Sequence, residues 1–182
     1  MPYSVPRKSD VPNLRTMALG ALNILDNNPR GMFLVIEGGA VDRAMHANNL
    51  ARMIEERIEF DDAIAAVSSY LDANTNGNNW SNTLIIVTAD HDHLLFGPDS
   101  DTVPFQELVD HGPGQVPGYR WQHNSHSNQL VPVYARGAGA AMVRTCATNR
   151  DSYTDMQGRT FGRGPYLDET NIFNIMSATG RC

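Results

Sequence analysis

The sequence predicts an α/β fold in which a mainly parallel sheet is flanked by helices. Two apolar runs, 32–36 and 83–88, are short and continuous, as strands are when helices cover both faces of a sheet. Helical periodicities precede, separate and follow these runs, and this alternation is typical of layered α/β proteins. The chain of 182 residues is most simply one domain over 1–182, long enough to bury a core.

The first half of the chain contains three predicted helices around the first strand. Apolar residues recur every three or four positions over 12–27, which predicts an amphipathic helix. The Asn, Pro and Gly residues that follow end this helix before strand 32–36. A second helix begins near Asp42, and a third carries an apolar stripe from Phe60 to Leu71.

The second half alternates loops with strands. The polar segment Asn74–Asn82 is a predicted loop before the second strand. Residues 94–125 are rich in Gly and Pro and have no clear period, so we expect a long loop excursion, which is often functional. A third strand is expected at 130–135, and Asp168 is expected to cap a final helix. That helix should turn three apolar side chains inward: Ile172, Ile175 and Met176.

Composition argues against several classes of partner. The chain has 14 Lys and Arg against 20 Asp and Glu, a formal net charge of −6, and so lacks the basic surface that binds nucleic acid. Affinity for phosphate would have to come from metals or a few arginines. The longest apolar runs fall far short of the roughly 20 residues of a membrane-spanning helix, so we expect no membrane partner. Residues 1–12 carry three prolines and no apolar stretch, so we expect no signal peptide there.

The chain contains two cysteines, Cys146 and Cys182. Neither lies in a Cys/His spacing that binds metal. A disulfide and two independent thiols remain equal alternatives, because the sequence does not show whether the Cα atoms approach within roughly 7 Å.

The first predicted strand ends in residues that bind metals. Ligands of parallel α/β sheets bind beyond the carboxyl ends of the strands, so residues that follow strand 32–36 are candidates for a ligand-binding site. Glu37 ends the strand, and Gly38 and Gly39 let the backbone turn sharply and approach a ligand. Asp42 and His46 are four residues apart, so on a helix they share a face and could bind one zinc ion at roughly 2.0–2.2 Å.

The second predicted strand is followed by four consecutive ionisable residues, Asp90, His91, Asp92 and His93. Such a run after an apolar strand is unfavourable unless something compensates it, and a pair of divalent metals would do so. Alternate side chains of an extended segment point to opposite sides, so one metal cannot easily bind all four. We expect some to be ligands and the others to hold the imidazoles in place.

Each group also has a simpler interpretation. Asp42 and His46 alone fit a surface pair on a solvated helix. Asp90–His93 alone fit a polar turn, and Glu37 alone fits a capping residue. His126, ahead of the predicted third strand, is weak evidence by itself, but acid and imidazole groups near three strands together favour a metal site. The remaining histidines and the tryptophans are interpreted as loop and packing residues, respectively: His111, His123, Trp80 and Trp121.

Three strings resemble successive metal-ligand segments of the alkaline phosphatases: FLVIEGGAVDRAMHANN, TLIIVTADHDH and HSNQLVPVYARG. Their order and spacing are highly specific together, and the resemblance runs from about Asn13 to the C-terminal helix. The family carries two zinc ions and one magnesium ion around a phosphate-binding serine. The resemblance therefore implies two-metal phosphoryl transfer through a serine nucleophile.

The resemblance assigns one complete zinc site. Asp42, His46 and His126 correspond to the three protein ligands of one zinc ion in the family. Three protein ligands leave one coordination position open, as a catalytic zinc requires. His93 corresponds to a residue beside this site that supports its ligands, whereas Asp92 has no implied role.

For the second zinc ion and the magnesium ion, the resemblance identifies only some of the ligands. Asp90 and His91 correspond to two ligands of the second zinc ion, and Glu37 corresponds to a magnesium ligand. Arg43 follows the zinc aspartate at a position that lies near the phosphate in family members, which suggests a phosphate contact.

Part of the family pattern has no counterpart here. The family's serine nucleophile, its substrate-binding arginine and further metal ligands lie upstream of these segments. The Asp-Ser pairs of this chain, Asp99-Ser100 and Asp151-Ser152, do not fit the nucleophile motif, so the nucleophile is unidentified. We expect the chain to correspond to the C-terminal half of a longer enzyme: a truncated or processed chain, one part of a split enzyme, or a fragment that acts alone.

The leading expectation is zinc- and magnesium-dependent hydrolysis of phosphate monoesters, with the monoester and inorganic phosphate as ligands. One alternative is a zinc- or phosphate-binding fragment without catalysis. Another is a member of the same metalloenzyme superfamily that cleaves phosphodiesters or phosphonates. The resemblance implies a periplasmic or extracellular location. Unpaired sheet edges invite association, so we expect a dimer or other homo-oligomer, or association with a missing N-terminal half.

Overall fold

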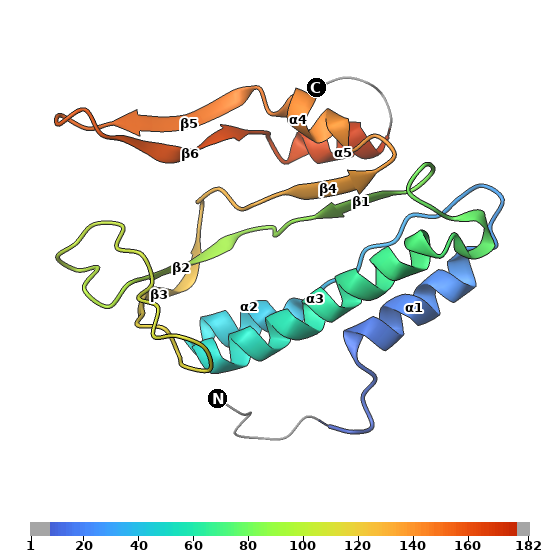
Figure 1. The fold of residues 1–182 in the computed structure, drawn as a ribbon, viewed down its shortest axis with the longest axis horizontal. Coiled ribbons are helices and arrows are strands. Elements are labelled where there is room, and N and C mark those ends of the chain that lie inside the picture. Colours follow the sequence, from blue (N-terminus) through green and yellow to red (C-terminus); the bar gives the residue numbers. More distant parts are fainter. Residues whose placement is uncertain (1–7, 178–182) are drawn as a thin grey trace. The chain divides into compact units, whose positions relative to one another are not determined.

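The computed structural model describes residues 8–177, which form two compact units (Figure 1). Unit 1 contains the described residues up to Tyr70 together with Asp92–Ser127. Unit 2 contains Leu71–His91 and the described residues from Asn128 onward. The single domain expected over 1–182 stays a prediction.

Three helices dominate unit 1 and confirm the helical periodicities of the sequence. They are α1 (Leu14–Leu25), α2 (Gly39–His46) and α3 (Leu50–Asp72), whose last two residues belong to unit 2. No helix within residues 8–177 has both the length and the apolar character that crossing a membrane requires.

Helix α1 is held at its start by a side-chain cap and just beyond its end by a hydrogen bond from α3. The Asn13 side chain accepts a hydrogen bond from the backbone N–H of Thr16 at 2.8 Å, which satisfies a donor at the helix start. The Tyr70 hydroxyl donates to the Asp26 carboxylate just beyond α1, at 2.7 Å. Ala18 and Leu22 are buried on α1, as its amphipathic pattern predicts.

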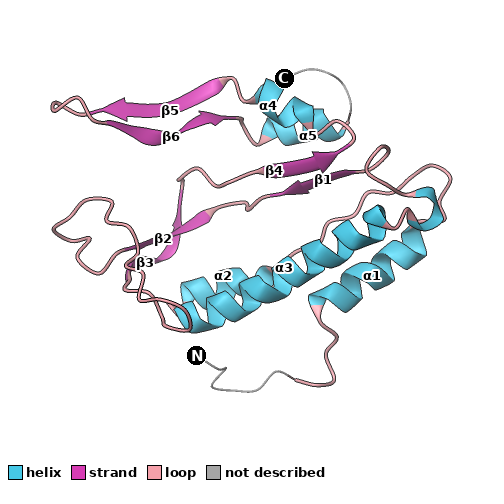
Figure 2. Ribbon diagram, viewed as in Figure 1, coloured by secondary structure: helices cyan, strands magenta, loops and turns pink. Residues whose placement is uncertain are grey.

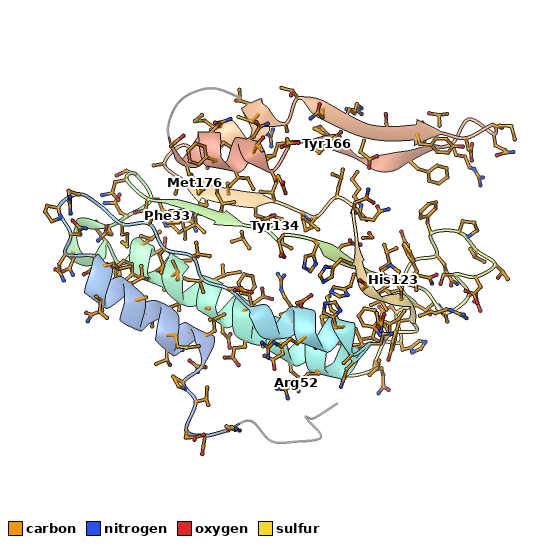
Figure 3. The ribbon with its side chains drawn as sticks, turned by 180° about the vertical axis from the view of Figure 1, so that it is seen from behind. Phe33, Arg52, His123, Tyr134, Tyr166 and Met176 are labelled. Atoms are coloured by element: carbon orange, nitrogen blue, oxygen red, sulfur yellow. The ribbon has the colours of Figure 1, made fainter. Side chains whose placement is uncertain are left out.

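Residues 32–36 do not form the predicted buried strand. The segment is extended, but it pairs with none of the described strands. Phe33, labelled in Figure 3, and Val35 are 71% and 73% exposed. The alternate residues Met32, Leu34 and Ile36 are half-buried. An apolar run shows that a segment can be buried, but a strand also needs a neighbour for its backbone hydrogen bonds.

Unit 1 also contains an antiparallel strand pair that the sequence did not reveal. Strands β2 (Asp92–Phe96) and β3 (Arg120–Ser127) flank a loop over 97–119, so the expected excursion over 94–125 is shorter than predicted (Figure 2). β3 is polar apart from Trp121 and carries no apolar stripe, so the sequence does not show its strand character.

Unit 2 contains two further antiparallel pairs, β1 with β4 and β5 with β6. The predicted strand 83–88 is confirmed as β1, but the strand expected at 130–135 begins only at Tyr134. Cys146 is fully buried in unit 2, whereas Cys182 lies outside the described residues. The elements of unit 2 are the 3₁₀ turn η1 (Thr75–Gly77), β1 (Leu84–Val87), β4 (Tyr134–Gly137), α4 (Ala141–Cys146), β5 (Asn149–Thr154), β6 (Thr160–Tyr166) and α5 (Thr170–Met176).

All strand pairs among the described residues are antiparallel, so the mainly parallel sheet is not confirmed over 8–177. Two of the pairs join strands that are consecutive in the chain, and direct connections of this kind favour antiparallel pairing. The segment 32–36, which was expected to be a parallel strand, enters none of these sheets.

Asp168 contacts the first residue of α5, but the N-cap position is Glu169, so the predicted cap lies one residue before it. Its carboxylate accepts hydrogen bonds from the Thr170 hydroxyl at 2.7 Å and from the Thr170 backbone N–H at 3.0 Å. These two hydrogen bonds, the one from the hydroxyl first, lower the pKa of Asp168 below its ordinary value. Ile175 is buried and Ile172 is half-buried, but Met176 is 44% exposed, so its predicted inward position is wrong.

Candidate metal centre

Helix α2 places the first two candidate ligands on one face. Asp42 lies in its first turn and His46 in its last, four residues apart. A carboxylate near the helix start and an imidazole near its end both interact favourably with the helix dipole. A Cβ atom on Gly38, the residue before α2, would lie 2.9 Å from the Phe60 ring of α3. The close backbone approach expected at the glycines is therefore made to Phe60, and it sets how near α2 lies to α3.

Strands β2 and β3 bring two further imidazoles to α2. His93 and His126 are direct partners in the antiparallel register, so they lie on the same face of the strand pair. Their ring centroids are 4.9 Å apart, and each lies 4.7 Å from the ring centroid of His46. His126 is therefore part of β3 and not, as expected, of a loop ahead of a strand.

One oxygen of Asp42 lies at the centre of this group. The distances from Asp42 Oδ1 are 2.8 Å to His93 Nε2 and 3.2 Å to His126 Nε2. The distance to His46 Nε2 is 3.5 Å, and the two Nε2 atoms of His46 and His126 are 2.9 Å apart. We call these four residues, Asp42, His46, His93 and His126, the Asp42 cluster.

A backbone carbonyl fixes the orientation of His46. The Asn124 carbonyl oxygen lies 2.7 Å from His46 Nδ1. A carbonyl can only accept, so Nδ1 must carry the hydrogen. The neutral ring then presents the lone pair of Nε2 to the cluster, as is usual for an imidazole that binds metal.

The cluster is anchored on one side and open on the other. The side chain of His93 is only 2% exposed, whereas those of Asp42, His46 and His126 are each about 40% exposed. The hydrogen bond from His93 is the main cause that holds the pKa of Asp42 below its ordinary value, although desolvation opposes it. Asp42 is therefore a carboxylate at neutral pH, and it reaches solvent together with His46 and His126, whereas His93 is buried.

The geometry fits a zinc ion. A tetrahedral zinc with bonds of about 2.0–2.1 Å separates its ligand atoms by about 3.3 Å. Asp42 Oδ1, His46 Nε2 and His126 Nε2 are separated from one another by 2.9, 3.2 and 3.5 Å. Nitrogen lone pairs as close as those of His46 and His126 also need a proton or a cation between them. Asp42, His46 and His126 could thus hold one zinc ion together, and the side chains of all three reach solvent.

Comparison with known proteins shows which family the chain belongs to. Residues 1–108 match the alkaline phosphatase family. The chain belongs to the alkaline phosphatase family. It is 33% identical over 183 residues to the alkaline phosphatase of Gadus morhua, which covers 91% of this chain and 36% of that protein. It is 27% identical over 203 residues to the tissue-nonspecific isozyme of Gallus gallus, which covers all of this chain and 38% of that protein.

Bacterial members and solved structures of the family are also similar. The alkaline phosphatase of Escherichia coli K12 is 29% identical over 160 residues, covering 84% of this chain and 33% of that protein. The structure of alkaline phosphatase from the Antarctic bacterium TAB5 is 26% identical with a TM-score of 0.55, covering 73% of this chain and 36% of that one. A variant of the TAB5 enzyme is described as having Mg bound in the M3 site. This alkaline phosphatase chain therefore spans well under half the length of the relatives it matches.

The remaining predicted metal ligands, Asp90, His91 and Glu37, are divided between the two units. Asp90 and His91 belong to unit 2, where Asp90 Oδ2 and His91 Nε2 are 3.4 Å apart. Glu37 is exposed at the end of the extended segment, directly before Gly38. Arg43 is exposed on α2 beside Asp42. Within unit 1 the structure thus joins the predicted zinc ligands and His93, but neither Glu37 nor Arg43 is part of the Asp42 cluster.

The other two histidines differ from each other. His111 lies in loop 97–119, as predicted, where its ring donates to the Val116 carbonyl at 2.9 Å. His123 was interpreted as a loop residue, but it lies in β3, and its label in Figure 3 marks the strand that also carries His126. The error has the same cause as the missed strand, which lacks an apolar stripe.

Two contributors to the site gave no signal that we recognised in the sequence. The Asn124 carbonyl acts through the backbone, so no residue type reveals it. Asp92 binds Ser127, the residue after His126, through hydrogen bonds from the hydroxyl at 2.8 Å and the backbone N–H at 3.2 Å. A hydroxyl directly after a candidate histidine ligand was the available clue to this contact.

Proposed function

We propose that this chain supplies the zinc-binding part of an alkaline phosphatase, which hydrolyses phosphate monoesters. The observation that carries the proposal is the triangle of Asp42 Oδ1, His46 Nε2 and His126 Nε2, whose sides of 2.9–3.5 Å suit one zinc ion. Membership of the alkaline phosphatase family, together with this triangle, favours phosphate chemistry over other uses of zinc.

Each residue of the Asp42 cluster would contribute to zinc binding in a different way. Asp42 contributes a full negative charge, and the hydrogen bond to Asn124 keeps Nε2 of His46 available. His93 is buried against Asp42 and holds its carboxylate in place. A zinc ion bound here would act as a Lewis acid towards an oxygen of the phosphate ester. The exposed side of the cluster gives the ester access.

The family resemblance supports a second zinc ion and a magnesium ion in the complete enzyme. Asp90 and His91 are proposed as ligands of that zinc, and Glu37 as a ligand of magnesium. The magnesium described for a TAB5 variant supports the use of this metal within the family. Arg43 is proposed to contact the phosphate, since it is exposed on the same helix as Asp42.

Location and assembly follow the family. We propose a periplasmic or extracellular location, which the bacterial relatives support. Assembly as a dimer or other homo-oligomer, or with a further polypeptide that supplies the serine region, is proposed because the apolar residues Phe33 and Val35 of unit 1 are exposed.

A second candidate function is zinc binding without turnover. The Asp42 cluster contains one carboxylate, three imidazoles and no serine among the described residues. Ser100 lies in loop 97–119, where its hydroxyl accepts from Gln122, and Ser152 lies in β5 of unit 2. These positions agree with the exclusion of both Asp-Ser pairs as the nucleophile.

The test is zinc-dependent hydrolysis of 4-nitrophenyl phosphate. The chain is assayed alone and mixed with a polypeptide that carries the upstream, serine-bearing region of an alkaline phosphatase. We expect phosphate release that a chelator abolishes and zinc restores, with a phosphodiester and a phosphonate hydrolysed at least about 100-fold more slowly. Stoichiometric zinc without release in either arm would instead establish the second candidate, and preference for the diester or phosphonate would change the substrate class.

A further inference from the structure

Asp92 and Ser127 form a contact at the outer end of the β2–β3 pair. They are the first residue of β2 and the last of β3, and they are direct partners in the register. One carboxylate oxygen of Asp92 accepts both the hydroxyl of Ser127, at 2.8 Å, and its backbone N–H, at 3.2 Å. The backbone N–H of Ser127 therefore donates to a side chain, whereas in a regular ladder it would donate to a backbone carbonyl of the partner strand. Asp92 and Ser127 are both half-buried.

The next pair inward is the one that carries the imidazoles, His93 with His126. Regular pairing then stops and resumes only at Leu95 with Trp121. Between these points lie one residue of β2, Leu94, and four residues of β3, 122–125. This bulge presents the Asn124 carbonyl to His46, and bulges often redirect side chains beside functional sites.

The bulge has a consequence for His126. Because the regular ladder is interrupted on its inner side, it cannot by itself fix where His126 lies. On its outer side β3 ends one residue later, and strand ends open readily. The contact between Asp92 and Ser127 holds this short segment at the outer end of the strand pair.

We propose that Asp92, acting through Ser127, is a positioning residue that holds His126 in the geometry needed to bind zinc. This inference rests on the proposed zinc site and deepens it. Asp92 lies on the face of the strand pair opposite to His93 and His126, because alternate side chains of a strand point to opposite faces. It therefore acts without touching the metal, through the backbone of the residue next to the ligand.

The contact is strong enough for this role. Hydrogen bonds to a carboxylate are shorter and roughly twice as strong as those between neutral groups. Residues that orient a metal ligand typically change metal affinity by about 10- to 100-fold when they are removed. We expect Asp92 to act at the lower end of this range, since the Ser127 backbone can bind water instead.

The test compares zinc affinity among four variants, measured by competition with a chromophoric chelator. Asp92→Ala should weaken zinc binding about 10-fold, and Ser127→Ala should weaken it less, because its backbone N–H still donates. Asp92→Asn keeps an acceptor oxygen and should stay within about threefold of the natural chain. The double variant Asp92→Ala/Ser127→Ala should bind no worse than Asp92→Ala alone, because both changes remove one contact.

A second readout separates positioning from general loss of structure. Cobalt(II) bound in place of zinc has visible absorption bands that depend on its coordination geometry. Asp92→Ala and Ser127→Ala should shift these bands, and Asp92→Asn should restore them. Asp101→Ala is the matched control, since Asp101 is also acidic and anchors β3 through a 2.6 Å ion pair with Arg120 at the strand's other end. It should leave both readouts unchanged.

The outcomes are distinct. Zinc affinity of Asp92→Ala within twofold of the natural chain, in a folded protein, would overturn the proposal. So would a loss in Asp92→Asn as large as in Asp92→Ala, because asparagine keeps an oxygen that can accept from the Ser127 hydroxyl and backbone N–H. If Asp92→Ala does not fold, the cobalt spectrum of Ser127→Ala decides the question. Failure of the natural chain to bind either metal would refute the proposed zinc site itself.

Discussion

Replacing Asp42 by alanine is expected to lower the zinc affinity of the chain by at least about 100-fold. Asp42 supplies the only carboxylate of the cluster, and its Oδ1 atom lies within 3.5 Å of the Nε2 atoms of all three histidines. Its loss removes one ligand and also the partner that orients His93, so the effect should exceed the 10- to 100-fold typical of supporting residues. Isothermal titration of zinc into the metal-free chain measures the change.

The control for this prediction is His111→Ala. His111 is an exposed histidine of unit 1 that lies in loop 97–119, and it contacts the Val116 carbonyl and not the cluster. Its replacement removes an imidazole from the chain without touching the predicted site, and zinc affinity should stay within about twofold. Equal zinc affinity in Asp42→Ala and His111→Ala would show that the metal binds elsewhere.

Replacing Gly38 by valine is expected to destabilise unit 1 by about 1–3 kcal/mol, the usual effect of forcing extra groups into a packed site. The backbone of Gly38 has an ordinary φ of −87°, so the effect comes from space and not from strain. The first added carbon would lie 2.9 Å from Cδ2 and 3.2 Å from Cβ of Phe60. Chemical denaturation gives the change in free energy of unfolding.

A compensating change separates crowding from other causes. Phe60→Leu removes part of the ring that the new side chain would meet, so Gly38→Val should destabilise the Phe60→Leu chain less than the natural chain. Zinc affinity should follow the same order, because α2 must move away from α3 and take Asp42 and His46 with it. Equal destabilisation in both backgrounds would contradict the proposed role of Gly38 as a spacer between the helices.

The helices could be predicted from the sequence because their signals are local. The apolar period over 12–27 corresponds to α1 with an error of two residues at each end. The stripe from Phe60 to Leu71 lies within α3, which begins ten residues earlier, at Leu50. Strands depend on partners that are distant in the sequence. Here the local pattern predicted one strand that does not form and missed another that does. The apolar run 32–36 forms no ladder, whereas the polar segment Arg120–Ser127 forms one.

The candidate site was predicted better than the strands that carry it. Asp42 and His46 could be paired because helical spacing of four residues places them on one face. His126 could be added only through the family resemblance, since no local pattern relates it to α2. The contact of Asn124 could not be predicted, because it is made by the backbone carbonyl. The contact of Asp92 with Ser127 was missed, because it depends on the register of two strands.

The most direct test of the zinc site is X-ray absorption at the zinc edge, recorded on the chain loaded with one equivalent of zinc. The account predicts only nitrogen and oxygen neighbours at about 2.0–2.1 Å, with outer-shell scattering from two imidazoles, His46 and His126. Scattering from three imidazoles would make His93 a ligand and not a support for Asp42. A sulfur neighbour at about 2.3 Å, or a zinc ion surrounded by water alone, would contradict the Asp42 cluster as the zinc site.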